Sequence, residues 1–212
     1  MPRIIECFSS LQGESTQAGR RCFFIRLEGC NLNCSYCDTA YARSGGVWKS
    51  VDEIVKDALA SGVSLVEITG GEPLLDESVP ELCRRLQAEN LEVMIETNGS
   101  LDVSVIPPGV RRIIDCKLPD SGMEKFNLYS NFTDLTSLDE VKFVVSSRRD
   151  FEFALQVISD YELEKSPAVL LVSPVWGRVS FEELAGWVIS SKSSLRMQLQ
   201  MHKLIWGDKP GV

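Results

Sequence analysis

The chain has 212 residues, of which 44% are hydrophobic and 25% charged, and its 22 Lys and Arg against 30 Asp and Glu give a formal net charge of −8. This composition is that of a folded globular protein and excludes a largely disordered one. The chain has no excess of Lys and Arg to bind phosphates and no apolar run of the ~20 residues that span a membrane, so we expect no nucleic-acid or membrane partner. The start of the sequence lacks the apolar core of a secretory signal, so we expect a cytoplasmic protein.

Strands and helices alternate along the sequence. Aromatic and branched residues predict a strand at residues 22–27, and a capping box of Ser50 and Glu53 begins a helix that continues to Gly62. A strand at 64–69, a helix near 78–89, and strands at 91–97 and 111–116 follow, with no clear helix between 97 and 111. The remaining elements are strands at 140–146, 168–173 and 195–200, a helix near 149–160, and a helix from a second capping box, Ser180 and Glu183, to residue 191.

Repeated strand and helix units indicate an α/β fold in which helices cover a parallel sheet. Such a sheet is either open and doubly wound or curled into a barrel. A complete eight-stranded barrel takes about 250 residues. About six or seven strands in 212 residues, with one unit lacking a helix, therefore favour a partial, incomplete TIM-like (β/α) barrel. No linker or low-complexity segment divides the chain, so we expect residues 1–212 to form a single domain.

Polar residues occur near the carboxyl ends of most predicted strands. In parallel α/β folds these strand ends and the loops after them build the active site, so the side chains should meet in one pocket. Each alone could simply mark where its strand leaves the core, but the set favours a site. The residues are Arg26, Glu67, Thr69, Glu96, Asn98, Asp115, Lys117, Ser173, Gln200 and His202.

Three of the seven cysteines, Cys30, Cys34 and Cys37, form a C-x3-C-x2-C group in the loop after the first predicted strand. Three thiolates this close repel one another unless a cation binds them, which predicts a metal site. Structural zinc usually has four protein ligands, and only His202, far along the chain, could be the fourth. An iron–sulfur cluster held by three cysteines would keep one iron open for another ligand. The scattered cysteines are expected to be buried apolar residues: Cys7, Cys22, Cys83 and Cys116.

This cysteine spacing, together with Gly70-Gly71-Glu72-Pro73 after the next strand, resembles the radical S-adenosylmethionine (SAM) superfamily. The resemblance implies a 4Fe–4S cluster held by the three cysteines, with SAM bound to the open iron. It also implies that reductive cleavage of SAM gives a 5′-deoxyadenosyl radical, which abstracts a hydrogen from the substrate. No ionisable side chain would then begin the reaction.

Further segments narrow the resemblance to the 7-carboxy-7-deazaguanine synthase family. They are residues 11–14, 24–32, 37–42, 96–99, 115–117, 141–143 and 200–212. The resemblance implies a carbon–nitrogen lyase that converts 6-carboxy-5,6,7,8-tetrahydropterin to 7-carboxy-7-deazaguanine with loss of ammonia, in queuosine and deazapurine biosynthesis. It also implies a homodimer and an electron donor such as flavodoxin.

The same resemblance assigns site residues. Gln12 or Glu14 can accept from the adjacent donors of a pterin, and the Arg26 fork suits the substrate carboxylate. Thr39 is assigned to a magnesium ion, a hard cation that takes oxygen ligands. The implied substrate contacts are Leu11, Gln12, Gly13, Glu14, Arg26, Thr69 and Val212. The implied SAM contacts are Tyr36, Asp38, Gly71, Glu72, Asp115, Cys116, Lys117 and Ser173.

Two segments depart from the family pattern. Residues 15–21 differ from the usual run of glycine and small residues, and residues 115–117 read Asp-Cys-Lys where part of the family has Ser-Pro-Lys. Two alternatives also stay open: a radical SAM activase that makes a glycyl radical on a partner protein, and a noncatalytic zinc-binding interaction module. About four irons per chain, against one zinc, would exclude the zinc module.

Overall fold

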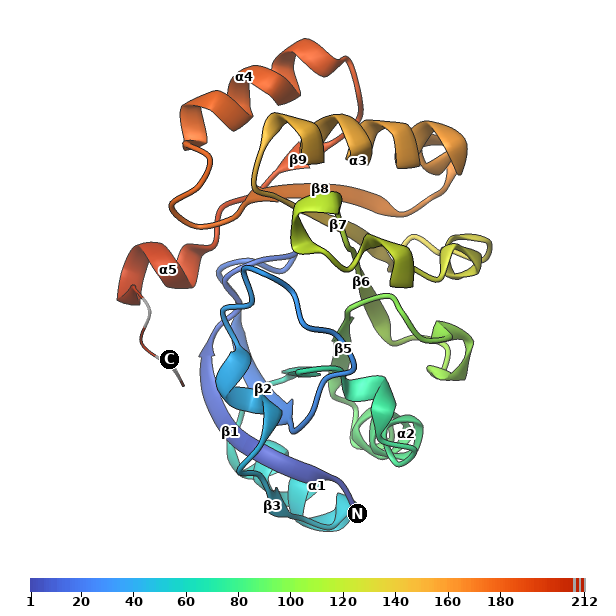
Figure 1. The fold of residues 1–212 in the computed structure, drawn as a ribbon. Helices are drawn as coiled ribbons and strands as arrows, with labels where there is room; N and C mark the ends of the chain where they lie inside the picture. Colours follow the sequence, from blue (N-terminus) through green and yellow to red (C-terminus); the bar gives the residue numbers. More distant parts are fainter. Residues whose placement is uncertain (208, 210, 212) are drawn as a thin grey trace.

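The computed structural model describes residues 1–207, 209 and 211, and its strands belong to one curved sheet in the order β3-β1-β2-β4-β5-β6-β7-β8-β9 (Figure 1). Strands β2 and β4 to β9 run parallel, whereas β1 pairs antiparallel with β2 and β3. Because β3 and β9 are the two edges of the sheet, the predicted incomplete barrel of parallel strands is confirmed. The strands are β1 Arg3–Leu11, β2 Arg21–Leu27, β3 Val47–Trp48, β4 Leu65–Gly70, β5 Glu92–Thr97, β6 Arg111–Cys116, β7 Glu140–Val145, β8 Val169–Pro174 and β9 Arg196–Met197.

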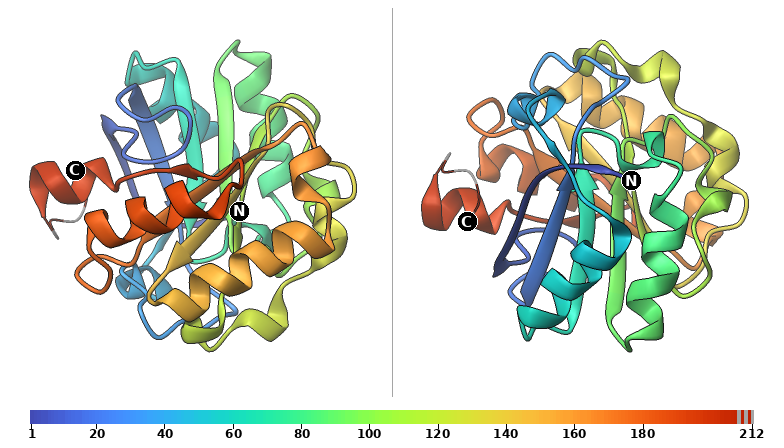
Figure 2. Two further views of the ribbon diagram at one scale, coloured as in Figure 1. Left: turned by 90° about the horizontal axis from the view of Figure 1, so that it is seen from above. Right: turned by 90° about the horizontal axis from the view of Figure 1, so that it is seen from below.

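Helices α1 to α4 lie on the outside of the sheet, and the short helix α5 lies beside the β1–β2 hairpin (Figure 2). Both predicted capping boxes form, at the starts of α1 and α4. The connection from β5 to β6 contains only a 3-10 turn, Val103–Val105, among its described residues, as the sequence predicts. The helices are α1 Val51–Ala60, α2 Val79–Ala88, α3 Arg148–Asp160, α4 Phe181–Ser191 and α5 Met201–Trp206.

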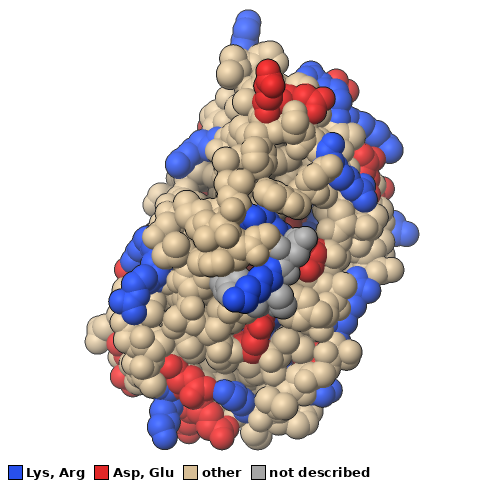
Figure 3. Space-filling model, turned by 90° about the vertical axis from the view of Figure 1, so that its left-hand side faces the viewer, with Lys and Arg blue, Asp and Glu red and all other residues tan. Residues whose placement is uncertain are grey.

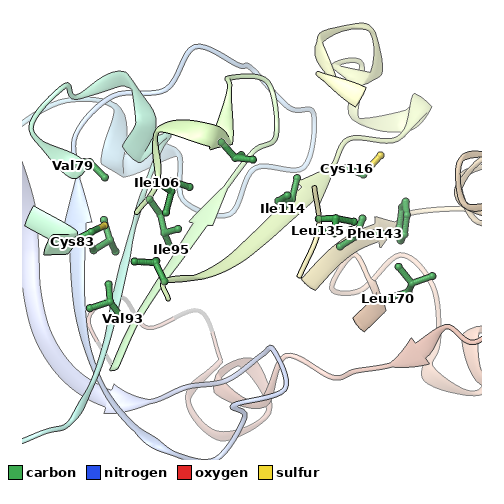
Figure 4. Packing of buried hydrophobic residues seen from close by; sticks show 14 of the residues in the cluster. Val79, Cys83, Val93, Ile95, Ile106, Ile114, Cys116, Leu135, Phe143 and Leu170 are labelled. Atoms are coloured by element: carbon green, nitrogen blue, oxygen red, sulfur yellow. The ribbon is translucent and has the colours of Figure 1, made fainter. Parts of the chain in front are cut away.

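The two faces of the sheet differ in chemistry. On the outer face, Ile95, Ile114 and Phe143 pack with helix residues such as Cys83 in the main hydrophobic core (Figure 4). On the inner face, a small apolar cluster lies below a polar layer near the carboxyl ends of the strands. This inner cluster consists of Cys22, Leu65, Met94 and Ile113, with Phe24 packed against it.

Strands β1 and β3 and helix α5 are not predicted from the sequence. The alternation of β1 is interrupted by a bulge between Ile4 and Glu6, which hides the strand pattern from the sequence. Of the strand predicted at 195–200, only Arg196–Met197 forms β9. Gln198 N still donates to Val172 O at 2.9 Å, and the side chains of Gln198 and Gln200 bind the β1–β2 loop. None of the described helices is both long enough and apolar enough to cross a membrane.

Candidate active site

The inner face of the sheet lines a cavity of about 660 Å³. The register explains its polar lining, because Arg26 pairs with Thr69 and Asp115 pairs with Lys142, and paired residues point to the same face. Among the described residues, every predicted strand-end residue lines this cavity except Ser173. Ser173 is fully buried, and its hydroxyl has no hydrogen-bond partner within the described chain.

Lys142 links two carboxylates at the centre of the cavity. Its ammonium donates to Glu14 at 3.0 Å and also to Glu96, and Gln200 Nε2 donates to the other Glu14 oxygen at 2.9 Å. Burial acts to raise the pKa of Glu14, but Lys142, Gln200 and His202 together hold it below the usual value. Burial also acts to lower the pKa of Lys142, but the facing Glu14 and Glu96 outweigh it and raise the pKa. The pair is therefore ionised at neutral pH.

Glu67 behaves differently from Glu14. It is only 2% exposed and accepts a hydrogen bond from Gln12 Nε2. Burial, and next the charge of Glu96, raise the pKa of Glu67 well above its ordinary value. Gln12 is oriented by the backbone, because its Oε1 accepts from Glu14 N at 2.7 Å. One carboxyl group that favours its proton and one amide thus lie side by side in the cavity.

Residues 12–20, which join β1 to β2, cross the amino ends of the parallel strands, and we call them the floor loop. Glu140 at the start of β7 is fully buried and accepts from Ser15 Oγ at 2.9 Å and from Thr16 N at 3.1 Å. Arg111 Nη1 lies 3.4 Å from the same carboxylate. Ser15 adopts a left-handed conformation with φ of 66°, which a non-glycine residue adopts only at an energetic cost. The floor loop is thus held at the end of the barrel opposite the cysteines, and its first residues, among them Gln12 and Glu14, line the cavity.

Helix α5 closes the side of the cavity next to the floor loop. Met201 N donates to Gly13 O at 2.9 Å, and a Cβ on Gly13 would lie 2.4 Å from His202 Nδ1. Gly13 is therefore required for this close packing, which also places His202 against the floor loop. On the face that carries α5, Lys, Arg, Asp and Glu side chains are scattered over a largely uncharged surface and form no large patch of one sign (Figure 3). Val212, an implied substrate contact, lies outside the described residues.

Arg26 on β2 is fixed by two neighbours. Its Nε donates to Glu6 Oε1 at 2.8 Å, and the Tyr41 hydroxyl donates to the same oxygen at 2.8 Å. The guanidinium carbon also lies 5.8 Å from the centre of the Tyr41 ring. Burial, partly offset by Arg26 and assisted by the hydrogen bond to Glu6, raises the pKa of Tyr41 to about 12, so its hydroxyl stays a donor.

The cysteine loop lies at the carboxyl ends of the strands, and the side chains of Cys30, Cys34 and Cys37 all line the cavity. Ser35 anchors the loop, because its Oγ donates to Asp120 O at 2.7 Å. Burial raises the pKa of Cys34, and nearby Lys117 partly offsets the effect. No group of three or more His, Cys, Asp or Glu side chains in the described chain is arranged to hold a metal ion. Cys22, Cys83 and Cys116 are buried and Cys7 is partly buried, as predicted for structural thiols.

The Gly70–Gly71 turn lies against the cysteine loop. Glu72 N donates to Gly29 O at 2.8 Å, and a Cβ on Gly71 would lie 2.0 Å from that oxygen and 2.7 Å from Cys30 Cβ. The Glu72 carboxylate accepts from Thr97 Oγ1 at 2.8 Å and from Asn98 N at 2.7 Å, so it joins the ends of β4 and β5. Within the described chain, the cavity lining includes Gly71 but not Glu72.

The other residues implied for SAM divide into two groups. Asp115 and Lys117 form an ion pair of 2.7 Å, and Asp115 Oδ1 is buried without a hydrogen-bond partner in the described chain. Tyr36 donates to Val144 O at 3.2 Å, and all three side chains line the cavity. Cys116, by contrast, points into the hydrophobic core.

These features fit the groups that the resemblance implies. Three thiols on one loop supply the donors that an iron–sulfur cluster takes, and Gly71, which also lines the cavity, lets its turn pack directly against the backbone next to Cys30. The free Asp115 Oδ1 offers an acceptor to a bound ligand. The site therefore has the parts for a cluster and a polar cofactor.

Thr39, the residue assigned to magnesium, also lines the cavity. Its hydroxyl donates to Asp38 Oδ1 at 2.9 Å, and Lys203 Nζ lies 3.7 Å from Asp38 Oδ2. Burial acts to raise the pKa of Asp38, but the Thr39 hydrogen bond and Lys203 hold it below its usual value. An ionised oxygen ligand and a hydroxyl thus stand next to each other.

The assignment from sequence omits three residues that the structure brings to the cavity or its wall: Lys142, Tyr41 and Glu6. Lys142 has a signal in the sequence, because Glu140 and Lys142 alternate with apolar residues in a predicted strand. Glu6 has none, because the bulge in β1 changes the face to which it points.

Comparison with known proteins identifies the family. Residues 24–124 match the radical SAM superfamily. A 7-carboxy-7-deazaguanine synthase from Koribacter versatilis is 40% identical over 96% of both chains, and one from Methanospirillum hungatei is 42% identical over 96% of this chain and 85% of that one. The crystal structure of QueE from Escherichia coli has the same fold, with a TM-score of 0.74 and 23% identity over 95% of this chain and 94% of that chain. The chain therefore belongs to the 7-carboxy-7-deazaguanine synthase family of radical SAM proteins.

Proposed function

We propose that this chain is a carbon–nitrogen lyase that converts 6-carboxy-5,6,7,8-tetrahydropterin to 7-carboxy-7-deazaguanine with loss of ammonia, in queuosine or deazapurine biosynthesis. Relatives of that name match it at about 40% identity over nearly its whole length. One observation on this chain carries the proposal: the cysteine loop and the Glu14–Lys142–Glu96 group open on the same cavity. A polar cavity of this kind suits a small heterocycle better than a protein partner.

Cys30, Cys34 and Cys37 are proposed to hold the 4Fe–4S cluster, and Gly71 and Asp115 to border the SAM site. When bound, these two groups supply the adenosyl radical that removes a substrate hydrogen. The protein's own part is to bind and orient the substrate and to exclude water from the radical.

The floor loop and β2 are proposed to bind the pterin. Gln12 and the ionised Glu14 present acceptors for the adjacent N–H groups of a pterin, and Arg26 faces the substrate carboxylate. Lys142 keeps Glu14 ionised, which makes Glu14 a strong acceptor. The proton favoured on Glu67 allows that carboxyl group to donate as well as accept.

A magnesium site and further substrate contacts are proposed in the same cavity. Thr39 beside the ionised Asp38 is suited to Mg²⁺, and Leu11, Gly13 and Thr69 line the cavity where substrate would lie. The single sheet supports one domain over residues 1–212. A homodimer, an electron donor such as flavodoxin and a cytoplasmic location are proposed on the family resemblance alone.

Anaerobic turnover tests the proposal. The reconstituted and reduced protein is mixed with SAM, Mg²⁺ and 6-carboxytetrahydropterin, and 5′-deoxyadenosine and 7-carboxy-7-deazaguanine are followed by mass spectrometry. We expect both products, with more deazaguanine than enzyme. SAM cleavage without deazaguanine would contradict the substrate, and bound zinc without iron would contradict the whole assignment.

The matched variants are Cys34→Ala in the cysteine loop and Cys83→Ala in the core of α2. The first should lose both iron and turnover, because Cys34 is one of the three proposed cluster ligands and Cys83 is not. The second should keep iron at the wild-type level. Equal turnover by both variants would contradict the role of the cysteine loop.

A further inference from the structure

We infer that Glu6 and Tyr41 are positioning residues, which hold the Arg26 guanidinium so that its terminal N–H groups face a carboxylate in the cavity. The inference rests on the proposed function, because the carboxylate is that of the pterin substrate. It extends that function by naming two residues that make the site selective for a carboxylated pterin over an unsubstituted one.

The bulge in β1 puts Glu6 on the inner face. Ile4 pairs with Leu27 and is 2% exposed in the outer core, whereas Glu6 pairs directly with Arg26. Without the shift between Ile4 and Glu6, the two residues would point to the same face of the strand. A bulge next to an active site commonly re-aims one side chain, and here the re-aimed side chain is the partner of Arg26.

The hydrogen bonds leave the outer edge of the guanidinium for a ligand. Glu6 Oε1 accepts from Arg26 Nε, and no hydrogen bond within the described chain uses Arg26 Nη1 or Nη2. These two nitrogens form the fork that grips a carboxylate with two parallel hydrogen bonds. Tyr41 fixes the arrangement from the other side, since its hydroxyl donates to the same Glu6 oxygen and its ring lies beside the guanidinium.

The other polar groups of the cavity explain why Arg26 needs such a support. Glu67 shares the cavity with Arg26, and its carboxyl oxygens are hydrogen-bond acceptors within the same cavity. A free arginine side chain has many rotamers and could turn toward this carboxyl group. With its Nε held by Glu6 and only 15% of its side chain exposed, Arg26 stays on the wall of the cavity.

The test compares two oxidised pterins that differ only in the carboxylate. Binding of 6-carboxypterin and of pterin to the reconstituted, SAM-loaded protein is measured anaerobically by fluorescence titration for wild type, Glu6→Gln and Tyr41→Phe. We expect Glu6→Gln to lower the affinity for 6-carboxypterin about tenfold, which corresponds to the loss of about one charge-assisted hydrogen bond. The affinity for pterin should fall less than about twofold. Tyr41→Phe should lower the ratio of the affinity for 6-carboxypterin to the affinity for pterin in the same direction, but by a smaller factor.

Glu152→Gln is the matched control, because Glu152 also pairs with an arginine, Arg148, but on the exposed surface of α3. It should leave both affinities unchanged. Equal weakening of both pterins by Glu6→Gln, or tighter binding of 6-carboxypterin, would overturn the inference; the second result would mean that Glu6 competes with the substrate for Arg26. If Glu6→Gln does not fold, an unchanged ratio in Tyr41→Phe overturns it.

The same titration separates this inference from the proposed function. If the wild-type protein binds both pterins equally, the proposed substrate is wrong and the inference fails with it. If the wild type prefers 6-carboxypterin and the Glu6 and Tyr41 variants keep the full preference, only the positioning role is wrong.

Discussion

Lys142 on β7 donates to Glu14 in the floor loop at 3.0 Å, across 128 positions of sequence. This hydrogen bond joins the start of the chain to the middle of the barrel, and it fixes the charge of a proposed substrate ligand. Stability and activity therefore depend on the same side chain.

Replacing Lys142 by Met should lower both the stability and the activity of the protein. The substitution leaves Glu14 and Glu96, whose side chains are 15% and 27% exposed, without their cation. Removal of one partner from a fully buried ion pair costs about 3 to 5 kcal/mol, and because water reaches these two carboxylates we expect a loss at the lower end of that range. The pKa of Glu14 should rise, and turnover should fall by at least about 100-fold. Urea denaturation and anaerobic turnover measure the two effects. Lys165→Met, which removes an exposed pair with Glu162, should change the free energy of unfolding by less than about 1 kcal/mol; a similar loss in both variants would contradict the prediction.

The raised pKa of Glu67 predicts how stability depends on pH. The folded protein keeps a proton on Glu67 that the unfolded chain loses above a pH of about 4.3, so this residue lowers stability as pH rises from there toward the folded pKa. The slope is at most about 1.4 kcal/mol per pH unit. Glu67→Gln keeps an acceptor for Gln12 and removes the titration. The free energy of unfolding of this variant should therefore exceed that of wild type at pH 7.5, and the difference should be smaller at pH 5.5.

Denaturant titrations at several pH values between these limits measure that difference. Glu92→Gln serves for comparison, because the hydrogen bond from Arg20 lowers the pKa of Glu92 and the residue is exposed. A stability gain in Glu67→Gln that does not grow with pH would disprove the role of the proton.

Two substitutions at Ser15 separate backbone strain from hydrogen bonding. Ser15→Ala loses the hydrogen bond to Glu140 and keeps the unfavourable φ of 66°, so it should destabilise the protein by about 2 kcal/mol. Ser15→Gly loses the same bond but relieves the strain, and its cost should be about 1 kcal/mol smaller. Urea denaturation of both variants gives the comparison, and the opposite order would show that φ at Ser15 carries no cost.

Gly71→Ala should disturb the cysteine loop. The added Cβ would lie 2.0 Å from Gly29 O and 2.7 Å from Cys30 Cβ, so the backbone next to Cys30 must move. We expect turnover to fall at least about tenfold and the iron content after reconstitution to fall with it. Gly186→Ala in α4, where nothing lies within 4 Å of the new Cβ, should keep the wild-type iron content. Equal iron in the two variants would contradict the prediction.

The fold was largely predictable because its parallel strands are apolar on the outer face and its helices begin at strong caps, such as Ser50 and Ser180. Lys142 could also have been recognised from its alternation with apolar neighbours in β7. Strand β1 could not, since the bulge before Glu6 breaks the two-residue period. Gln12 and Glu14 were suggested by the family resemblance alone, because no periodicity indicates that a hairpin loop enters a barrel from its amino end.

The floor loop has a consequence for how such a site can change. The cysteine loop and the Gly71 turn lie at the carboxyl ends of the strands, whereas Gln12 and Glu14 reach the cavity from the opposite end. The two ends share the strands and helix α5, which contacts Gly13 and places Lys203 3.7 Å from Asp38. A new floor of the same length that keeps Gly13 against α5 can therefore alter ligand preference and leave the thiols in place. Redesign of residues 12–20, with Glu140 retained as their anchor, is thus a separate problem from retaining the metal-binding end.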